Sequence, residues 1–130
     1  MIRALAAFAW ATLCGAAHAC GDAGDTVVAG ERYAVAYRTA PSPIPASRHF
    51  AIDFTICPVG NAPAARTVRV DASMPEHRHG MNYKTTVTAK GGGRYRAEGL
   101  LFHMTGRWQS AFDVVAGGTT ERIASSVELP

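Results

Sequence analysis

Large apolar residues recur at every second position in one stretch of this chain, residues 48–57, as Phe50, Ile52, Phe54 and Ile56. Smaller or polar residues fill the positions between them. A period of two sends successive side chains to opposite faces of an extended strand, so that one face can be apolar and the other polar. This stretch therefore predicts a β-strand with one face in a hydrophobic core.

Six further stretches show the same alternation or are rich in the β-branched residues that favour strands. They cover residues 31–38, 66–72, 83–90, 94–101, 106–115 and 119–129. Gly91–Gly93 and Gly117–Gly118 separate two pairs of these stretches, and glycine adopts the positive φ that tight hairpins need. After Ala19 no stretch has the 3.6-residue period of an amphipathic helix. About seven short strands at even spacing predict an all-β fold, an antiparallel β-sandwich of immunoglobulin-like type.

The N-terminus follows a different pattern. Met1–Arg3 is basic, Ala4–Leu13 is apolar, and Ala17–Ala19 offers the small residues that signal peptidase requires. We predict a signal peptide at residues 1–19, cleaved to leave one domain at residues 20–130 in the periplasm or outside the cell. An uncleaved membrane anchor is disfavoured because the apolar run is short. A lipoprotein is disfavoured by an alanine at the position where the lipobox usually carries leucine.

Cleavage would leave two cysteines, Cys20 and Cys57, because Cys14 lies in the signal peptide. In an oxidising compartment a single pair of cysteines in a small domain most simply forms a disulfide. Such a bond would fix the N-terminal segment to the core and add about 3–4 kcal/mol of stability by restricting the unfolded chain. The alternative is that both remain thiolates and bind metal, which oxidation outside the cytoplasm disfavours.

Methionine and histidine concentrate in two short motifs. Residues 74–83 read Met-Pro-Glu-His-Arg-His-Gly-Met-Asn-Tyr, and residues 102–108 read Phe-His-Met-Thr-Gly-Arg-Trp. Apart from Met1, these motifs hold every methionine of the chain and all but two of its 5 histidines. His77 and His79 would project to the same side of an extended backbone. The candidate metal ligands are Met74, His77, His79, Met81, His103 and Met104.

The types of ligand favour copper. Thioether sulfur is soft and selects Cu(I), while imidazole binds Cu(I) and Cu(II) alike. Zinc is the second choice, because His77, His79 and His103 would form a three-histidine site with an open position. Glu76 could then act as a general base, but the methionines would have no role. A third interpretation needs no metal, since the methionines can pack under Trp108 and the histidines can hydrogen-bond loop carbonyls.

The charge pattern and the absence of catalytic motifs narrow the classes of function. The formal net charge is +3, and the cations are scattered along the chain, so we do not expect nucleic-acid binding. The sequence contains no nucleophile elbow, P-loop, dinucleotide fingerprint or haem-attachment motif, and we do not expect an enzyme. Asp71 and Arg107 could form an ion pair that holds the two motifs together, or both could be exposed charges.

Residues 70–81, together with Gly93–Tyr95 and Gly106–Trp108, resemble the YtkA-like domain family. The most specific part is the run Met-Pro-x-His-x-His-Gly-Met and the Gly-x-Trp start of a strand. The family is similar in outline to the FixH proteins associated with assembly of haem–copper oxidases and, more distantly, to the CopC copper carriers. The resemblance extends over roughly Glu31–Leu129. It implies an immunoglobulin-like or cupredoxin-like periplasmic β-sandwich and, by association, copper handling.

We therefore expect an exported domain that binds one copper ion, preferably Cu(I), and transfers it to another exported or membrane metalloprotein. The first motif would supply the main ligands, Met74, His77, His79 and Met81. The second motif would complete or gate the site through His103 and Met104. The alternative is a non-catalytic interaction domain, in which both motifs are structural and an open sheet edge binds another exported protein.

Overall fold

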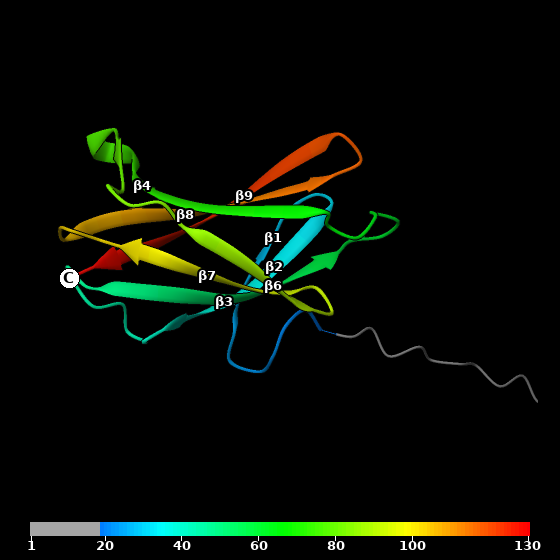
Figure 1. The fold of residues 1–130 in the computed structure, drawn as a ribbon, viewed down its shortest axis with the longest axis horizontal. Coiled ribbons are helices and arrows are strands. Elements are labelled where there is room, and N and C mark those ends of the chain that lie inside the picture. Colours follow the sequence, from blue (N-terminus) through cyan, green and yellow to red (C-terminus); the bar gives the residue numbers. More distant parts are fainter. Residues whose placement is uncertain (1–18) are drawn as a thin grey trace, which may run out of the picture.

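The computed structural model describes residues 19–130 and contains two antiparallel sheets packed face to face (Figure 1). One sheet has the strand order β1-β2-β3-β7-β6, and the other has the order β5-β4-β8-β9. The strands are β1 (Thr26–Ala29), β2 (Tyr33–Ala40), β3 (His49–Pro58), β4 (Thr67–Met74), β5 (His79–Gly80), β6 (Thr86–Gly91), β7 (Arg94–Leu101), β8 (Gly106–Ala116) and β9 (Thr119–Leu129). A short 3-10 helix, η1 (Pro75–His77), follows β4. The predicted β-sandwich is confirmed, while the predicted signal peptide lies outside the described residues apart from Ala19.

The alternation of apolar residues decides which side chains enter the core. The inner face of β3 supplies four residues that are at most 4 % exposed: Phe50, Ile52, Phe54 and Ile56. The inner face of β8 supplies Trp108, Phe112 and Val114, all fully buried. All seven predicted strands form. The sequence pattern missed β1 and β5, because runs of 4 and 2 residues are too short to reveal a period.

The N-terminal segment lies on the outer face of the first sheet. Cys20 is bonded to Cys57 of β3, 37 residues further along the chain, which confirms the predicted disulfide. The next residue, Gly21, packs directly on β2. A Cβ at Gly21 would lie 2.3 Å from the Cβ of Ala36, so a larger residue there would lift the segment from the sheet.

Ion pairs fix the same segment. Arg94 donates two hydrogen bonds to Asp22, at 2.9 and 3.0 Å. Arg38 donates to Asp22 and to Asp25, both at 2.8 Å. The hydrogen bonds and the charge of Arg94, followed by those of Arg38, lower the pKa of Asp22 to about 2. We call residues 20–25 and their partners the N-terminal clamp.

The two methionine–histidine motifs meet at one end of the sandwich. Figure 1 shows the segment between β4 and β6 and the turn between β7 and β8 at the same end, where the C-terminus also lies. The Gly91–Gly93 turn between β6 and β7 lies toward the opposite end. The topology therefore brings together two motifs that are far apart in the sequence.

Candidate metal site

The first motif folds into a tight loop after β4. Pro75 begins η1, where its fixed φ suits the first helical position. Arg78 then adopts a left-handed conformation with φ 54°, and its N–H donates to the Pro75 carbonyl at 3.2 Å. The chain reverses at this residue, so β5 pairs with Ser73 and Met74 at the end of β4. The motif is thus a compact reversal, in which His77 lies in η1 and His79 in β5 rather than on one extended strand.

Three imidazole rings gather at this end despite the different backbone. The ring centroids of His77 and His79 are 5.9 Å apart, and those of His79 and His103 are 5.3 Å apart. Two imidazoles that share one ion through bonds of about 2 Å have ring centres about 5–6.5 Å apart. Both pairs have this spacing. Their planes are inclined by only 25° and 33°, so the rings must rotate before their lone pairs point at one ion.

Trp108 packs against the rings of His79 and His103. Its own ring is fully buried at the start of β8 and stacks on Phe102, with centroids 4.4 Å apart and planes inclined by 3°. His79 and His103 approach it edge-on, with centroids at 6.0 and 5.4 Å. The indole Nε1–H donates to the backbone carbonyl of Met104 at 2.9 Å. Trp108 therefore holds the β7–β8 turn and supports two histidines at the same time.

His103 carries a buried nitrogen without a partner. Its Nδ1 is inaccessible to solvent and has no hydrogen-bond partner among residues 19–130. The backbone around it is well held: the Ser47 N–H donates to the Phe102 carbonyl at 2.9 Å, and its hydroxyl donates to the His103 carbonyl at 3.5 Å. A buried polar atom left unpaired costs about 1–3 kcal/mol, and such atoms are rare in folded proteins. Among the described residues, Oε1 of Glu121 is also buried without a partner, so the Nδ1 of His103 is a candidate donor because of its neighbours and not because it is unpaired.

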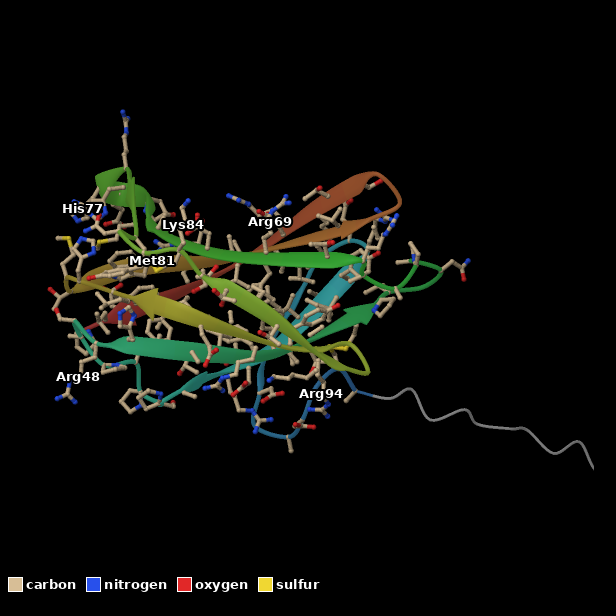
Figure 2. The ribbon with its side chains drawn as sticks, in the orientation of Figure 1. Arg48, Arg69, His77, Met81, Lys84 and Arg94 are labelled. Atoms are coloured by element: carbon tan, nitrogen blue, oxygen red, sulfur yellow. A yellow bond between two sulfur atoms is a disulfide. The ribbon has the colours of Figure 1, made fainter. Side chains whose placement is uncertain are left out.

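The three methionines occupy different environments. Met74 is 1 % exposed and packs below β8, where its Cε lies 2.8 Å from the position of a Cβ on Gly106. Met81 packs against the hydrophobic core and lines a groove between β4 and β6, and Figure 2 shows it nearer the strands than His77. Met104 is 38 % exposed, on the turn that carries His103. Met104 is therefore the most exposed of these three methionines.

Of the two alternatives for Asp71 and Arg107, the described residues show no ion pair between them. Arg107 lies 3.9 Å from Glu76, and both side chains are more than half exposed. Asp71, the expected partner of Arg107, instead accepts a hydrogen bond from the N–H of Ala72 at 2.8 Å. The pair of Glu76 and Arg107 joins η1 to β8, but exposed pairs of this kind contribute little to stability. The loop is held mainly by β5 pairing and by the aromatic contacts.

The donors present fit a soft ion better than a borderline one. In the part of the chain that the structure describes, no three His, Cys, Asp or Glu side chains are already arranged to hold a metal ion. A three-histidine zinc site is thus not preformed. A set of imidazoles with a thioether is the donor chemistry that suits Cu(I). The exposed residue Met104 carries a thioether, and His103 carries an imidazole whose buried Nδ1 an ion reaches only after the ring turns toward the surface.

The fold and this site define a small disulfide-linked β-sandwich protein with a histidine–methionine cluster over a buried tryptophan. The family model described as YtkA-like matches residues 29–112, which is more than half of the chain. The chain belongs to the YtkA-like family, as the two motifs indicated. Comparison with curated proteins and with solved structures finds no match. Within residues 19–130 no helix is long and apolar enough to cross a membrane, and the disulfide is compatible with a location outside the cytoplasm.

Two features of the site were not foreseen from the sequence. The stack of Phe102 on Trp108 depends on the chain leaving β7 one residue before Phe102, which alternation alone does not reveal. The unpaired Nδ1 of His103 depends on the packing of three separate segments. The sequence signal for this part of the site is the pair Phe102 and His103 shortly before Gly106. This pair combines an apolar residue that can enter the core with a potential metal ligand.

Proposed function

We propose that this protein is an exported copper-binding protein, a carrier or an accessory of copper homeostasis, that holds one Cu(I) ion beside Trp108. The observation that carries the proposal is that the ring of His79 lies 5.9 Å from that of His77 and 5.3 Å from that of His103, at the end of the sandwich that also carries Met104. These rings come from two motifs separated by two strands, β6 and β7. The disulfide accords with a periplasmic or secreted location. In such a location thiols oxidise, whereas methionine and histidine remain available as metal ligands.

The ligand set we propose is smaller than the six candidates in the sequence. His79, His103 and Met104 form its centre, and His77 lies close enough to His79 to join them. Met74 and Met81 contribute packing, since one is 1 % exposed and the other lies against the core. Either could reach the ion only after the loop rearranges. Copper is favoured over zinc because Met104 is exposed beside the histidines and a thioether is a soft donor.

An anaerobic titration with Cu(I) against a colorimetric chelator tests this function. We expect near-stoichiometric binding, and quenching of the fluorescence of Trp108, which is the only tryptophan after Trp10. The double variant His79→Asn/His103→Asn should lose at least about 100-fold in affinity, because even residues that only support ligands cost 10–100-fold. The matched control, Met81→Leu, should bind as wild type does. A wild-type protein that fails to compete with the chelator would falsify the proposal.

A second candidate is an interaction domain in which both motifs are structural. It is favoured by the edge strand β6 and by a groove of about 560 Å³ between β4 and β6, lined by Val70, Met81, Lys84 and Val87 among others. An extended segment of another protein could pair with such an edge. The melting temperature with and without Cu(I) distinguishes the two candidate functions. A ligand that binds only the native state raises the melting temperature, so Cu(I) should stabilise a copper protein and leave a pure interaction domain unchanged.

A further inference from the structure

The proposed ligands differ in how deeply they lie. His103 has a nitrogen that solvent does not reach, and His79 is half-buried between His103 and His77. His77 and Met104 are exposed, the latter by 38 %. We infer that the site has two tiers, in which His79 and His103 retain the copper(I) ion and His77 and Met104 control its transfer to an incoming ligand. This inference rests on the proposed function.

The inner tier is held by contacts that persist without an ion. His79 belongs to β5, whose pairing with Met74 fixes its backbone. Its Nδ1 lies 3.2 Å from the Gly80 carbonyl, and a proton on Nδ1 that makes this hydrogen bond leaves the lone pair of Nε2 for a ligand. The ring of His103 lies between His79 and Trp108, with centroids at 5.3 and 5.4 Å. Packing thus fixes the places of both rings, so that only rotation of the rings is needed to direct their nitrogens at one ion.

The outer tier lies on backbone with fewer supports. His77 ends a 3-10 helix of 3 residues, none of them buried, and the residue after it is the left-handed Arg78. Met104 is held through its carbonyl by Trp108, while the residue as a whole is 38 % exposed. A thioether carries no charge, and its side chain has three rotatable bonds. These residues can leave the ion without disturbing Trp108 or the strands.

Transfer then proceeds by ligand exchange without any change of oxidation state. A donor atom of the incoming molecule forms a bond to Cu(I) on the exposed side, and the bond to the sulfur of Met104 breaks. His77 follows in the same way, and the two inner nitrogens release the ion last. In this scheme the outer ligands set the rate of exchange, while the inner ligands set most of the affinity.

Four single variants of the copper-loaded protein test the two tiers. His103→Asn and His79→Asn remove inner ligands, Met104→Leu removes an outer ligand, and Met81→Leu is the matched control for loss of a thioether. The equilibrium affinity is measured by competition with a Cu(I) chelator. The transfer rate is measured by mixing the loaded protein with excess chelator in a stopped-flow instrument and following the recovery of Trp108 fluorescence. Circular dichroism establishes that each variant is folded.

We expect each inner variant to lower the affinity at least about 100-fold. Met104→Leu should lower it less than about fivefold, yet speed transfer about tenfold, because a position for the chelator is already open. Met81→Leu should change neither quantity. Equal losses of affinity in Met104→Leu and the inner variants would overturn the two tiers while leaving copper binding intact. If His103→Asn does not fold, the same comparison is made with His79→Asn. A wild-type protein that binds no Cu(I) overturns the proposed function together with this inference.

Discussion

The N-terminal clamp and the histidine–methionine end of the sandwich both gather polar side chains in a small area, yet they differ in whether those groups have partners. In the clamp, Asp22 is hydrogen-bonded to Arg38 and Arg94, and Asp25 is hydrogen-bonded to Arg38. At the other cluster, the Nδ1 of His103 is buried with no partner among the described residues. The charged groups of the clamp are hydrogen-bonded to one another, whereas a ring nitrogen at the histidine–methionine end has no partner within residues 19–130.

This difference separates a structural cluster from a candidate binding site. A closed network of charges satisfies its own hydrogen-bonding groups, so its natural role is to fix a segment of chain. An unpaired buried nitrogen destabilises the free protein, and a ligand that coordinates it removes that cost. The clamp should therefore govern stability with little influence on copper. The histidine–methionine end should govern copper binding with a smaller influence on stability.

Removal of the disulfide should have the largest effect on stability. The double variant Cys20→Ala/Cys57→Ala releases a loop of 37 residues in the unfolded chain, and we expect the free energy of unfolding to fall by about 3–4 kcal/mol. Denaturation with urea measures this change. Copper(I) affinity, measured in the absence of denaturant, should remain within about twofold of wild type, because sites that share no partners act independently. A large loss of affinity in the folded variant would show that clamp and site are coupled.

Replacement of Trp108 by phenylalanine should affect both properties, because Trp108 belongs to the core and to the site. The variant loses the Nε1–H that binds the Met104 carbonyl at 2.9 Å and leaves a small cavity. We expect a loss of about 1–3 kcal/mol of stability. We also expect a loss of about tenfold in Cu(I) affinity, since the turn that carries two ligands is no longer held. Urea denaturation and chelator competition measure the two effects.

Phe112→Leu supplies the control for this variant. Phe112 is fully buried in β8 and contacts Tyr37 and Phe54, away from the histidines. The variant Phe112→Leu should lower the free energy of unfolding by about as much as Trp108→Phe does, through lost packing, and leave the affinity for Cu(I) unchanged. If both variants weaken copper binding equally, the effect of Trp108→Phe comes from general loosening of the core and not from the turn.

The sequence predicts the sandwich well for a physical reason. The pattern at Phe50, Ile52, Phe54 and Ile56 reflects a two-residue period that any half-buried strand must obey. The hairpins at Gly91–Gly93 and elsewhere reflect the few residues that tolerate positive φ. Such rules are local, so a single sequence contains them in full. The very short strand β5 obeys no visible period, because its pairing is imposed by the reversal at Arg78.

The site could be predicted only in part. The sequence names its candidate ligands, because methionine and histidine cluster in two motifs. It does not reveal that Met74 is buried or that Met81 packs against the core, since this depends on how the loop crosses between the two sheets. Nor does it reveal that the Nδ1 of His103 has no partner, which requires all neighbouring segments to be in place. The types of side chain that could bind a metal can be read from short stretches of sequence. Their burial and their hydrogen-bond partners depend on the whole fold.

Acid should weaken the clamp through Asp22, with the smallest of the three effects. The pKa of this carboxyl is lowered from 3.8 to about 2, first by its hydrogen bonds to Arg94 and by the charge of Arg94. A depressed pKa in the folded state gives stability that is complete above pH 3.8 and is lost as the pH falls through about 2. Asp22→Asn should therefore melt slightly below wild type at pH 7 and converge with it near pH 2.

Asp113→Asn is the matched variant for this measurement. Arg122 lowers the pKa of Asp113 by the same kind of hydrogen bond, but on the second sheet and away from the N-terminal segment. Both variants should show a deficit in melting temperature that shrinks as the pH falls. Only Asp22→Asn should also speed cleavage of the N-terminal segment by a protease at pH 7, because Asp22 belongs to that segment and Asp113 does not. A deficit for Asp22→Asn that is the same at pH 2 and pH 7 would mean that the charge of the Asp22 carboxylate does not hold the clamp.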